Sequence, residues 1–249
     1  MTKISAIIPT LNEEIYIADA IKSVCFADEI IVIDSYSTDR TIEIAEKLNV
    51  KIIKRKFDDF SSQKNFAIDQ AIHPWIYILD ADERVTEGVK AEILAAVKDP
   101  KDFVGFYVRR TFYFCEKKVN YSGFQRDKVM RLFLKEHCKY VGLVHEKIVT
   151  KGKIDFFKNK IDHFSYRNYD HYISKMNHYA AIRAEELHRQ GKKATIYHVI
   201  IKPAARFFIH YIICLGFLDG FTGFLVAKTQ AYGVLTRYIK LWLLNKGIK

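Results

Sequence analysis

Asp80 and Asp82 are the residues whose types and spacing most directly indicate chemistry. They follow the apolar run 75–79, whose aromatic and β-branched residues predict a buried strand beginning after Pro74. Successive side chains of an extended strand point to opposite faces, so a turn must begin here if both carboxylates are to reach one ligand. Carboxylates at the carboxyl end of a strand suit a hard cation, Mg²⁺ or Mn²⁺, which can hold a diphosphate. The alternative is a strand end with two solvated acids.

The first hundred residues alternate between strand-like and helix-like segments. Strands are predicted at 4–9, 30–34, 50–54 and 75–79, and helices at 13–24, 39–48, 61–72 and 86–98. Thr86 is the expected cap of the fourth helix, which Asp99-Pro100 ends. This order predicts an α/β fold with a doubly wound, mostly parallel sheet.

Polar clusters follow three of the four predicted strands. They are Pro9–Glu14, Asp34–Thr41 and Asp80–Asp82. Each has a plainer alternative, because Asn12, Ser37 and Asp39 are all residue types that cap helices. Three such clusters on one sheet edge predict a polar crevice that binds a nucleotide. The sequence contains neither GxGxxG nor GxxxxGK[ST], so a dinucleotide fingerprint and a P-loop are not indicated.

Three segments resemble the motifs of glycosyltransferase family 2. They are the run 5–13 (SAIIPTLNE), the stretch 34–41 and Asp80-Ala81-Asp82. The resemblance implies a GT-A fold with a mixed, mostly parallel sheet, and inversion of the sugar's anomeric configuration. It implies a nucleotide-sugar pocket bordered by Pro9, Thr10, Asn12, Glu13, Asp34, Asp39 and Asp80, with Asp34 near the uracil. Asp82 would hold the metal on the donor diphosphate. Tyr36 departs from the family pattern, which usually has glycine there.

Lys64 is a further nucleotide-side candidate within Gln63-Lys64-Asn65. It either adds a cation beside the nucleotide or lies on a solvated helix face.

Three more strand-like segments, at 103–114, 129–134 and 144–149, are expected to extend the sheet on the acceptor side. Sugar transfer needs a base for the acceptor hydroxyl and positive charge for the departing diphosphate. Glu146 is the candidate base. Its alternative is a strand-edge acid paired with Lys147.

Four motifs resemble one subgroup of family 2, which contains the lipopolysaccharide inner-core β-1,4-glucosyltransferases. They are Gly105–Val108, Met130–Phe133, Val144–Glu146 and Asp162–Tyr166. The resemblance implies that Glu146 is the base, with His145 and Arg131 as further catalytic candidates. It makes Asp127 an acceptor-side candidate and His163 a metal ligand, with a packed structural histidine as the alternative.

The net charge of +11 comes from the C-terminal part of the chain. Residues 1–150 contain 23 basic and 23 acidic residues, whereas residues 151–249 contain 17 and 6. A basic region faces an anionic partner. An amphipathic helix is predicted at 169–189, and the apolar run 207–218 is shorter than the ~20 residues that span a bilayer.

The longer stretch 207–227 would place His210 and Asp219 inside the membrane, which is costly. We therefore expect helices in the membrane interface, with basic residues meeting lipid phosphates. The alternative is a helical appendage packed on the catalytic domain.

The sequence predicts a GT-A catalytic domain at 1–166 and a basic helical region at 167–249. Four dispersed cysteines and an N-terminus that enters a strand directly indicate a cytoplasmic protein without a signal peptide, on the cytoplasmic face of the inner membrane. The resemblance implies transfer of a hexose, with glucose favoured, from a UDP-sugar to a lipopolysaccharide-core or other lipid-linked glycan.

Two alternatives stay open. In transfer to polyprenyl phosphate, the acceptor oxygen is already ionised and a base matters little. A non-catalytic membrane or nucleic-acid binding protein on a degenerate scaffold would not need the Asp80/Asp82 pair. The aromatic residues of the tail lie in apolar runs, which argues against nucleic acid as a partner.

Overall fold

The computed structural model describes residues 3–142, 147–166 and 168–248. These residues form two compact units. The first, here called the sheet unit, comprises residues 1–110 and 127–163; the second, the helical unit, comprises 111–126 and 164–249. The expected catalytic role of residues 1–166 and membrane role of residues 167–249 stay predictions.

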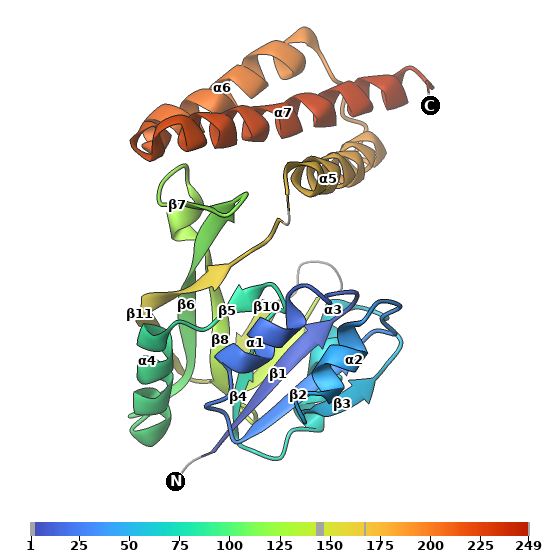
Figure 1. The fold of residues 1–249 in the computed structure, drawn as a ribbon. Helices are drawn as coiled ribbons and strands as arrows, with labels where there is room; N and C mark the ends of the chain where they lie inside the picture. The colour runs from blue at the N-terminus through green and yellow to red at the C-terminus, as the bar shows by residue number, and fades with distance from the viewer. Residues whose placement is uncertain (1–2, 143–146, 167, 249) are drawn as a thin grey trace. The chain divides into compact units, whose positions relative to one another are not determined.

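Four parallel strands form one half of the sheet, in the order β3-β2-β1-β4. They are β1 (Ile4–Thr10), β2 (Glu29–Asp34), β3 (Lys51–Lys54) and β4 (Trp75–Ile78). The register pairs Thr10 with Asp34 and Ile7 with Ile78, so these three strands end at one edge. Helices α1 (Ile17–Ser23), α2 (Thr41–Glu46) and α3 (Phe60–Asp69) connect them, which confirms the predicted alternation (Figure 1).

Alternate side chains of β1 enter two apolar cores. Ile8 packs with α1, with α2 and with α4 (Glu87–Lys98) on one face, and Ile7 packs with α3 on the other. Because both faces are covered by helices, the strands are apolar on both sides. Thr86 caps α4 as predicted, with its hydroxyl accepting from the Val89 amide at 3.4 Å.

The other half of the sheet is antiparallel, so the whole is a mixed α/β sheet. Strand β8 (Lys128–Leu134) pairs with β4, and β6 (Phe103–Phe114) pairs with β8. Beyond β6 lie β11 (Lys153–His163) and the two-residue strand β5 (Glu83–Arg84), which pairs with β11. The short β5 and the long β11 were not predicted.

One predicted strand does not extend the sheet. The described part of segment 144–149 belongs to β10 (Lys147–Thr150), which pairs with β9 (Cys138–Val141) in a separate two-stranded sheet. The reason is that β8 is already flanked by β4 and β6, and β6 by β8 and β11, which leaves no open edge there.

The helical unit contains α5 (Tyr169–Arg189), α6 (Lys202–Phe208) and α7 (Gly220–Asn245), with β7 (Lys117–Val119) paired to the end of β6. The helix predicted at 169–189 is confirmed, and Asn168 caps it by accepting from the His171 amide at 2.8 Å. Among the described residues no single helix is long and apolar enough to cross a membrane. One helix pair, Tyr197–Ile213 with Gly216–Asn245, passes that test together and is bent by 72°.

His210 and Asp219, which lie inside the stretch 207–227, both bind the segment 120–122. Asp219 accepts hydrogen bonds from the Asn120 amide at 3.0 Å and the Tyr121 amide at 2.8 Å. The Nδ1 atom of His210 lies 2.6 Å from the Ser122 carbonyl oxygen. Both polar side chains are therefore hydrogen-bonded within the helical unit.

Candidate active site

The loops after β1 and β2 are joined by hydrogen bonds. The Asn12 amide donates to Ser37 Oγ at 2.9 Å, and Asn12 Oδ1 accepts from the Thr38 amide at 2.8 Å. Ser37 Oγ in turn donates to the buried Asp34 at 2.5 Å. Neither Asn12 nor Ser37 caps a helix through its side chain, so the capping alternative is wrong for both. These residues instead hold the two loops together.

Tyr36 stands in the left-handed region of backbone conformation, with φ of 64°. Glycine adopts this conformation at no steric cost, whereas another L-residue pays about 1 kcal/mol. The loop thus keeps the backbone path that glycine favours at this position, and the Tyr36 side chain is exposed.

A second set of contacts ties the same loops together at their far ends. The Glu13 amide donates to Thr41 Oγ1 at 2.8 Å, and the Glu14 amide donates to Asp39 at 3.1 Å. Asp39 also accepts from the Thr41 amide at 2.9 Å, one residue before the N-cap position of α2, which Arg40 occupies without a side-chain cap. Hydrogen bonds from Thr41 outweigh desolvation and lower the pKa of Asp39. Thr10 is buried at the end of β1, and its hydroxyl has no hydrogen-bond partner among the described residues.

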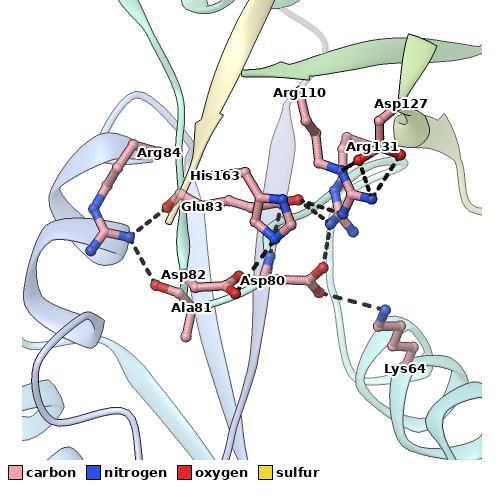
Figure 2. Close-up of polar contacts among 10 residues, drawn as sticks. All are labelled: Lys64, Asp80, Ala81, Asp82, Glu83, Arg84, Arg110, Asp127, Arg131 and His163. Carbon is pink, nitrogen blue, oxygen red and sulfur yellow. Dashed lines mark hydrogen bonds and ion pairs between the residues drawn. The ribbon is translucent and has the colours of Figure 1, made fainter. Parts of the chain in front are cut away.

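Asp80 lies between two cations. The predicted turn is present, because the Glu83 amide donates to the Asp80 carbonyl at 2.9 Å. The Arg131 guanidinium binds one carboxylate oxygen of Asp80, and Lys64 Nζ lies 3.6 Å from the other (Figure 2). Desolvation opposes ionisation, but Arg131 and then Lys64 hold the pKa of Asp80 well below its usual range.

Lys64 is 4% exposed, so the alternative of a solvated helix face is wrong. Its ammonium also lies 5.2 Å from the centroid of the Tyr140 ring, a cation–π distance. Arg131 is likewise buried, at 3% exposure. Its guanidinium contacts both Asp80 and Glu83.

Glu83 is a site residue that the sequence reasoning missed. It is fully buried, accepts from Arg131 at 2.5 Å and lies 3.4 Å from Arg110 Nη1. Desolvation raises the pKa of Glu83, against the opposing charge of Arg131. Arg110, also missed, reaches Asp127 at 2.7 Å, so the acceptor-side candidate Asp127 is linked to the same network. The signal available in the sequence was a third acid directly after Asp80-Ala81-Asp82.

Asp82 faces His163 across the end of β11. The Asp82 carboxylate and His163 Nε2 lie 3.5 Å apart, and their side chains are 23% and 16% exposed. An oxygen and an imidazole nitrogen at this separation fit a shared divalent cation. Among the described residues no group of three or more histidines, cysteines and acids could hold a metal ion. Mg²⁺ usually takes one or two carboxylates and completes its shell with water and substrate phosphates, so the pair fits such an ion.

Comparison with known proteins decides the family. The family model described as glycosyl transferase family 2 matches residues 5–169. The chain belongs to this family.

Two curated relatives extend the family's likeness over nearly the whole chain. An uncharacterized glycosyltransferase of Rickettsia felis is 30% identical over 254 residues, covering 97% of this chain and 90% of the relative. The lipopolysaccharide core biosynthesis glycosyltransferase LpsC of Rhizobium meliloti is 28% identical, covering 94% and 90%.

A solved structure with partial likeness is glucosyl-3-phosphoglycerate synthase from Mycobacterium tuberculosis, in complex with Mn²⁺, UDP and glucosyl-3-phosphoglycerate. It aligns with a TM-score of 0.39 and 19% identity, over 45% of this chain and 44% of that one.

Two predicted site residues, His145 and Glu146, lie outside the described residues. Of the others, the structure gathers Asp80, Lys64, Arg131 and Asp127 in one charged network with Glu83 and Arg110, and places Asp82 next to His163. Asn12, Glu13 and Asp39 lie in the loops after β1 and β2, Asp34 ends β2, and Pro9 and Thr10 end β1. Family membership supports a glycosyltransferase activity.

Proposed function

We propose that this family 2 glycosyltransferase moves a hexose, with glucose favoured, from a UDP-sugar to a sugar hydroxyl with inversion. The observation that carries the proposal is the Asp80 network. Buried Arg131 and Lys64 keep Asp80 ionised, and the turn from Asp80 to Glu83 leaves Asp82 next to His163 at the end of the sheet. The loops after β1 and β2 supply the polar crevice for the nucleotide.

Asp82 and His163 are the residues that would hold Mg²⁺ or Mn²⁺. When bound, such an ion supplies positive charge for the departing diphosphate. Arg131 and Lys64 act through Asp80, because both of their cationic groups are engaged by its carboxylate. Glu146 is the proposed base that takes the proton of the acceptor hydroxyl, with His145 beside it in the sequence.

The proposed acceptor is a lipopolysaccharide-core or other lipid-linked glycan. The relative LpsC, whose name places it in lipopolysaccharide core biosynthesis, covers almost the whole chain and so supports this class. Transfer to polyprenyl phosphate is the second candidate.

Release of UDP from a panel of UDP-sugars tests the donor and the metal. We expect release from one UDP-sugar that requires Mg²⁺ or Mn²⁺ and falls about 100-fold in Asp82→Asn, as when one group that stabilises developing charge is removed. Asp102→Asn is the matched control, because Asp102 is an exposed acid of the sheet unit that pairs only with Lys153 among the described residues. Equal release with and without metal, or an unaffected Asp82→Asn variant, would count against the proposal.

Glu146→Gln separates the two acceptor classes. With a sugar hydroxyl as acceptor, we expect turnover to fall on the order of 10²-fold or more, as is typical when a general base is removed. With polyprenyl phosphate the loss should be small, because the attacking oxygen is already ionised. Turnover of the variant with each acceptor distinguishes the two classes. UDP must bind the variant as tightly as it binds the wild type.

We further propose that the helical unit attaches to an anionic membrane surface on the cytoplasmic side. Its exposed large apolar residues include Ile196, Ile200, Ile213, Leu218, Phe221 and Trp242. Basic residues lie among them in the sequence, including Lys202, Arg206, Lys240 and Lys246. Exposed apolar residues interspersed with cations are the composition expected of a helix pair that lies in the interface of an anionic bilayer.

A further inference from the structure

A small cationic pocket opens in the sheet unit beside the Asp80 network. It has a volume of about 230 Å³ and is lined chiefly by Tyr107, Lys128, Met130, Arg131, Tyr140 and Lys147. Its walls come from β6, β8 and the β9–β10 sheet. Among the residues that the structure describes, the lining contains three cations and no acidic residue. We call it the cationic pocket.

Two of the residues that line the cationic pocket are buried. Arg131 and Tyr140 are 3% and 5% exposed. The Nη2 atom of Arg131 is engaged by Asp80 and Glu83, but its Nε–H has no hydrogen-bond partner among the described residues. A buried donor left unpaired costs free energy, and most such donors find a partner in a protein, water or ligand. An anionic group in this pocket would face that unpaired guanidinium donor.

Two lysines add positive charge at the exposed part of the pocket. Lys128 is held over aromatic rings, with its Nζ 5.4 Å from the Tyr107 centroid and 4.8 Å from that of Phe156. These two rings stack on each other at 5.3 Å. Within the described ranges, neither Lys128 nor Lys147 is paired with an acid. No acid in the described part of the chain therefore neutralises their charge.

Size and position restrict the occupant. The volume is below the 300–1,000 Å³ of sites that enclose drug-sized ligands, so the pocket takes one sugar residue or its charged substituent. None of the crevice residues after β1 and β2 lines it, which separates it from the nucleotide side. Lys147 follows the proposed base Glu146 directly in the sequence.

We propose that the cationic pocket binds an anionic substituent, a phosphate or a carboxylate, carried by the acceptor sugar. Arg131 joins this subsite to Asp80, because one guanidinium contributes to both. That the bound sugar is the acceptor rests on the proposed function. That the pocket binds an anion does not.

Saturation-transfer NMR on the full-length chain tests the proposal, with UDP and Mg²⁺ present. The probes are glucose 6-phosphate, glucuronate and glucose. We expect at least one anionic sugar to bind fivefold or more tightly than glucose, with an affinity that falls as salt is raised. Lys128→Gln and Lys147→Gln should each weaken that binding about three- to tenfold, as loss of one charged contact does. Lys158→Gln, an exposed lysine on β11, is the matched control and should change nothing.

The outcomes separate the hypotheses. Preference for the phosphate or for the carboxylate identifies the source of the anion, and either supports the site. Glucose binding as tightly as both anionic sugars would overturn it. So would anion binding that is unchanged in the two lysine variants while UDP still binds. If the wild type does not bind UDP, the result counts against the proposed function. The anion site is then supported or overturned by the binding of the three sugars alone.

Discussion

Arg131 and Glu83 are the buried charges on which the candidate site depends. Arg131 joins Asp80 to Glu83, and Arg110 joins Glu83 to Asp127. Desolvating such charges is costly, and the cost is met only while each keeps its partners. The network therefore couples the integrity of the sheet unit to the position of the acidic turn.

Arg131→Met should destabilise the protein by about 3–5 kcal/mol, because it leaves Asp80 and Glu83 without their main cation. Urea denaturation measures the free energy of unfolding. Adding Glu83→Gln should recover part of the loss, since one uncompensated buried charge is then removed. Arg40→Met is the control, because Arg40 pairs with Glu43 on the surface and its loss should leave the transition midpoint unchanged. A loss in Arg131→Met no larger than in this control would contradict the account.

At the scale of elements, the bend before α7 depends on two glycines that approach closely. A Cβ added at Gly223 would lie 1.8 Å from the Gly216 carbonyl oxygen, which is backbone and cannot move aside. A Cβ at Gly233 would lie 2.2 Å from Met176 Cε, the tip of a flexible side chain. Both Cβ atoms would clash, but only at Gly233 can the neighbouring side chain move aside.

Gly223→Ala should destabilise the helical unit by about 1–3 kcal/mol, the range for overpacking a close contact. Gly233→Ala should cost clearly less, because Met176 can change rotamer. Thermal unfolding followed by circular dichroism at 222 nm compares the two variants. Equal effects would show that the Gly216 contact is not what shapes the bend.

The contact between His210 and Ser122 gives the helical unit a dependence on pH. Desolvation lowers the pKa of His210, and the nearby Arg206 adds to this while the Ser122 carbonyl opposes it. An unfolded histidine has a pKa of about 6.5, so the stabilisation is present above that pH and is lost as pH falls toward the lower folded value.

The wild-type melting temperature should therefore drop between pH 7.5 and pH 5.5 by more than that of His210→Asn, which keeps a donor for the Ser122 carbonyl but does not titrate. His178→Asn, at an exposed histidine of α5, should behave like the wild type. An identical pH response in all three proteins would remove His210 as the cause.

At the scale of the whole molecule, the uneven charge and the exposed apolar residues predict how the protein partitions between water and lipid vesicles. The wild type should float with vesicles containing phosphatidylglycerol and much less with neutral vesicles or at high salt. Phe221→Ser should weaken this about tenfold through lost apolar burial. Ile72→Ser is the matched control, because Ile72 is as exposed, 73% against 74%, but belongs to the sheet unit. Strong binding to an oligonucleotide without binding to vesicles would overturn the membrane proposal.

The sequence by itself determined the βαβα alternation, the polar clusters at the strand ends and the long helix at 169–189. These features depend on local periodicity and on capping residues, which a short window contains in full. The family motifs likewise lie in short contiguous runs, and the match over residues 5–169 agrees with them.

Only the tertiary structure decided which charges meet. Arg131 is 51 residues from Asp80 and 48 from Glu83 along the chain, and no local pattern specifies that pairing. The same holds for Asp219, which binds amides 98 and 99 residues away, and for β10, which pairs with β9 because the sheet has no open edge beside β8. Long-range pairing follows from which edges and buried carboxylates remain to be satisfied once the core has formed, and that is a property of the folded chain alone.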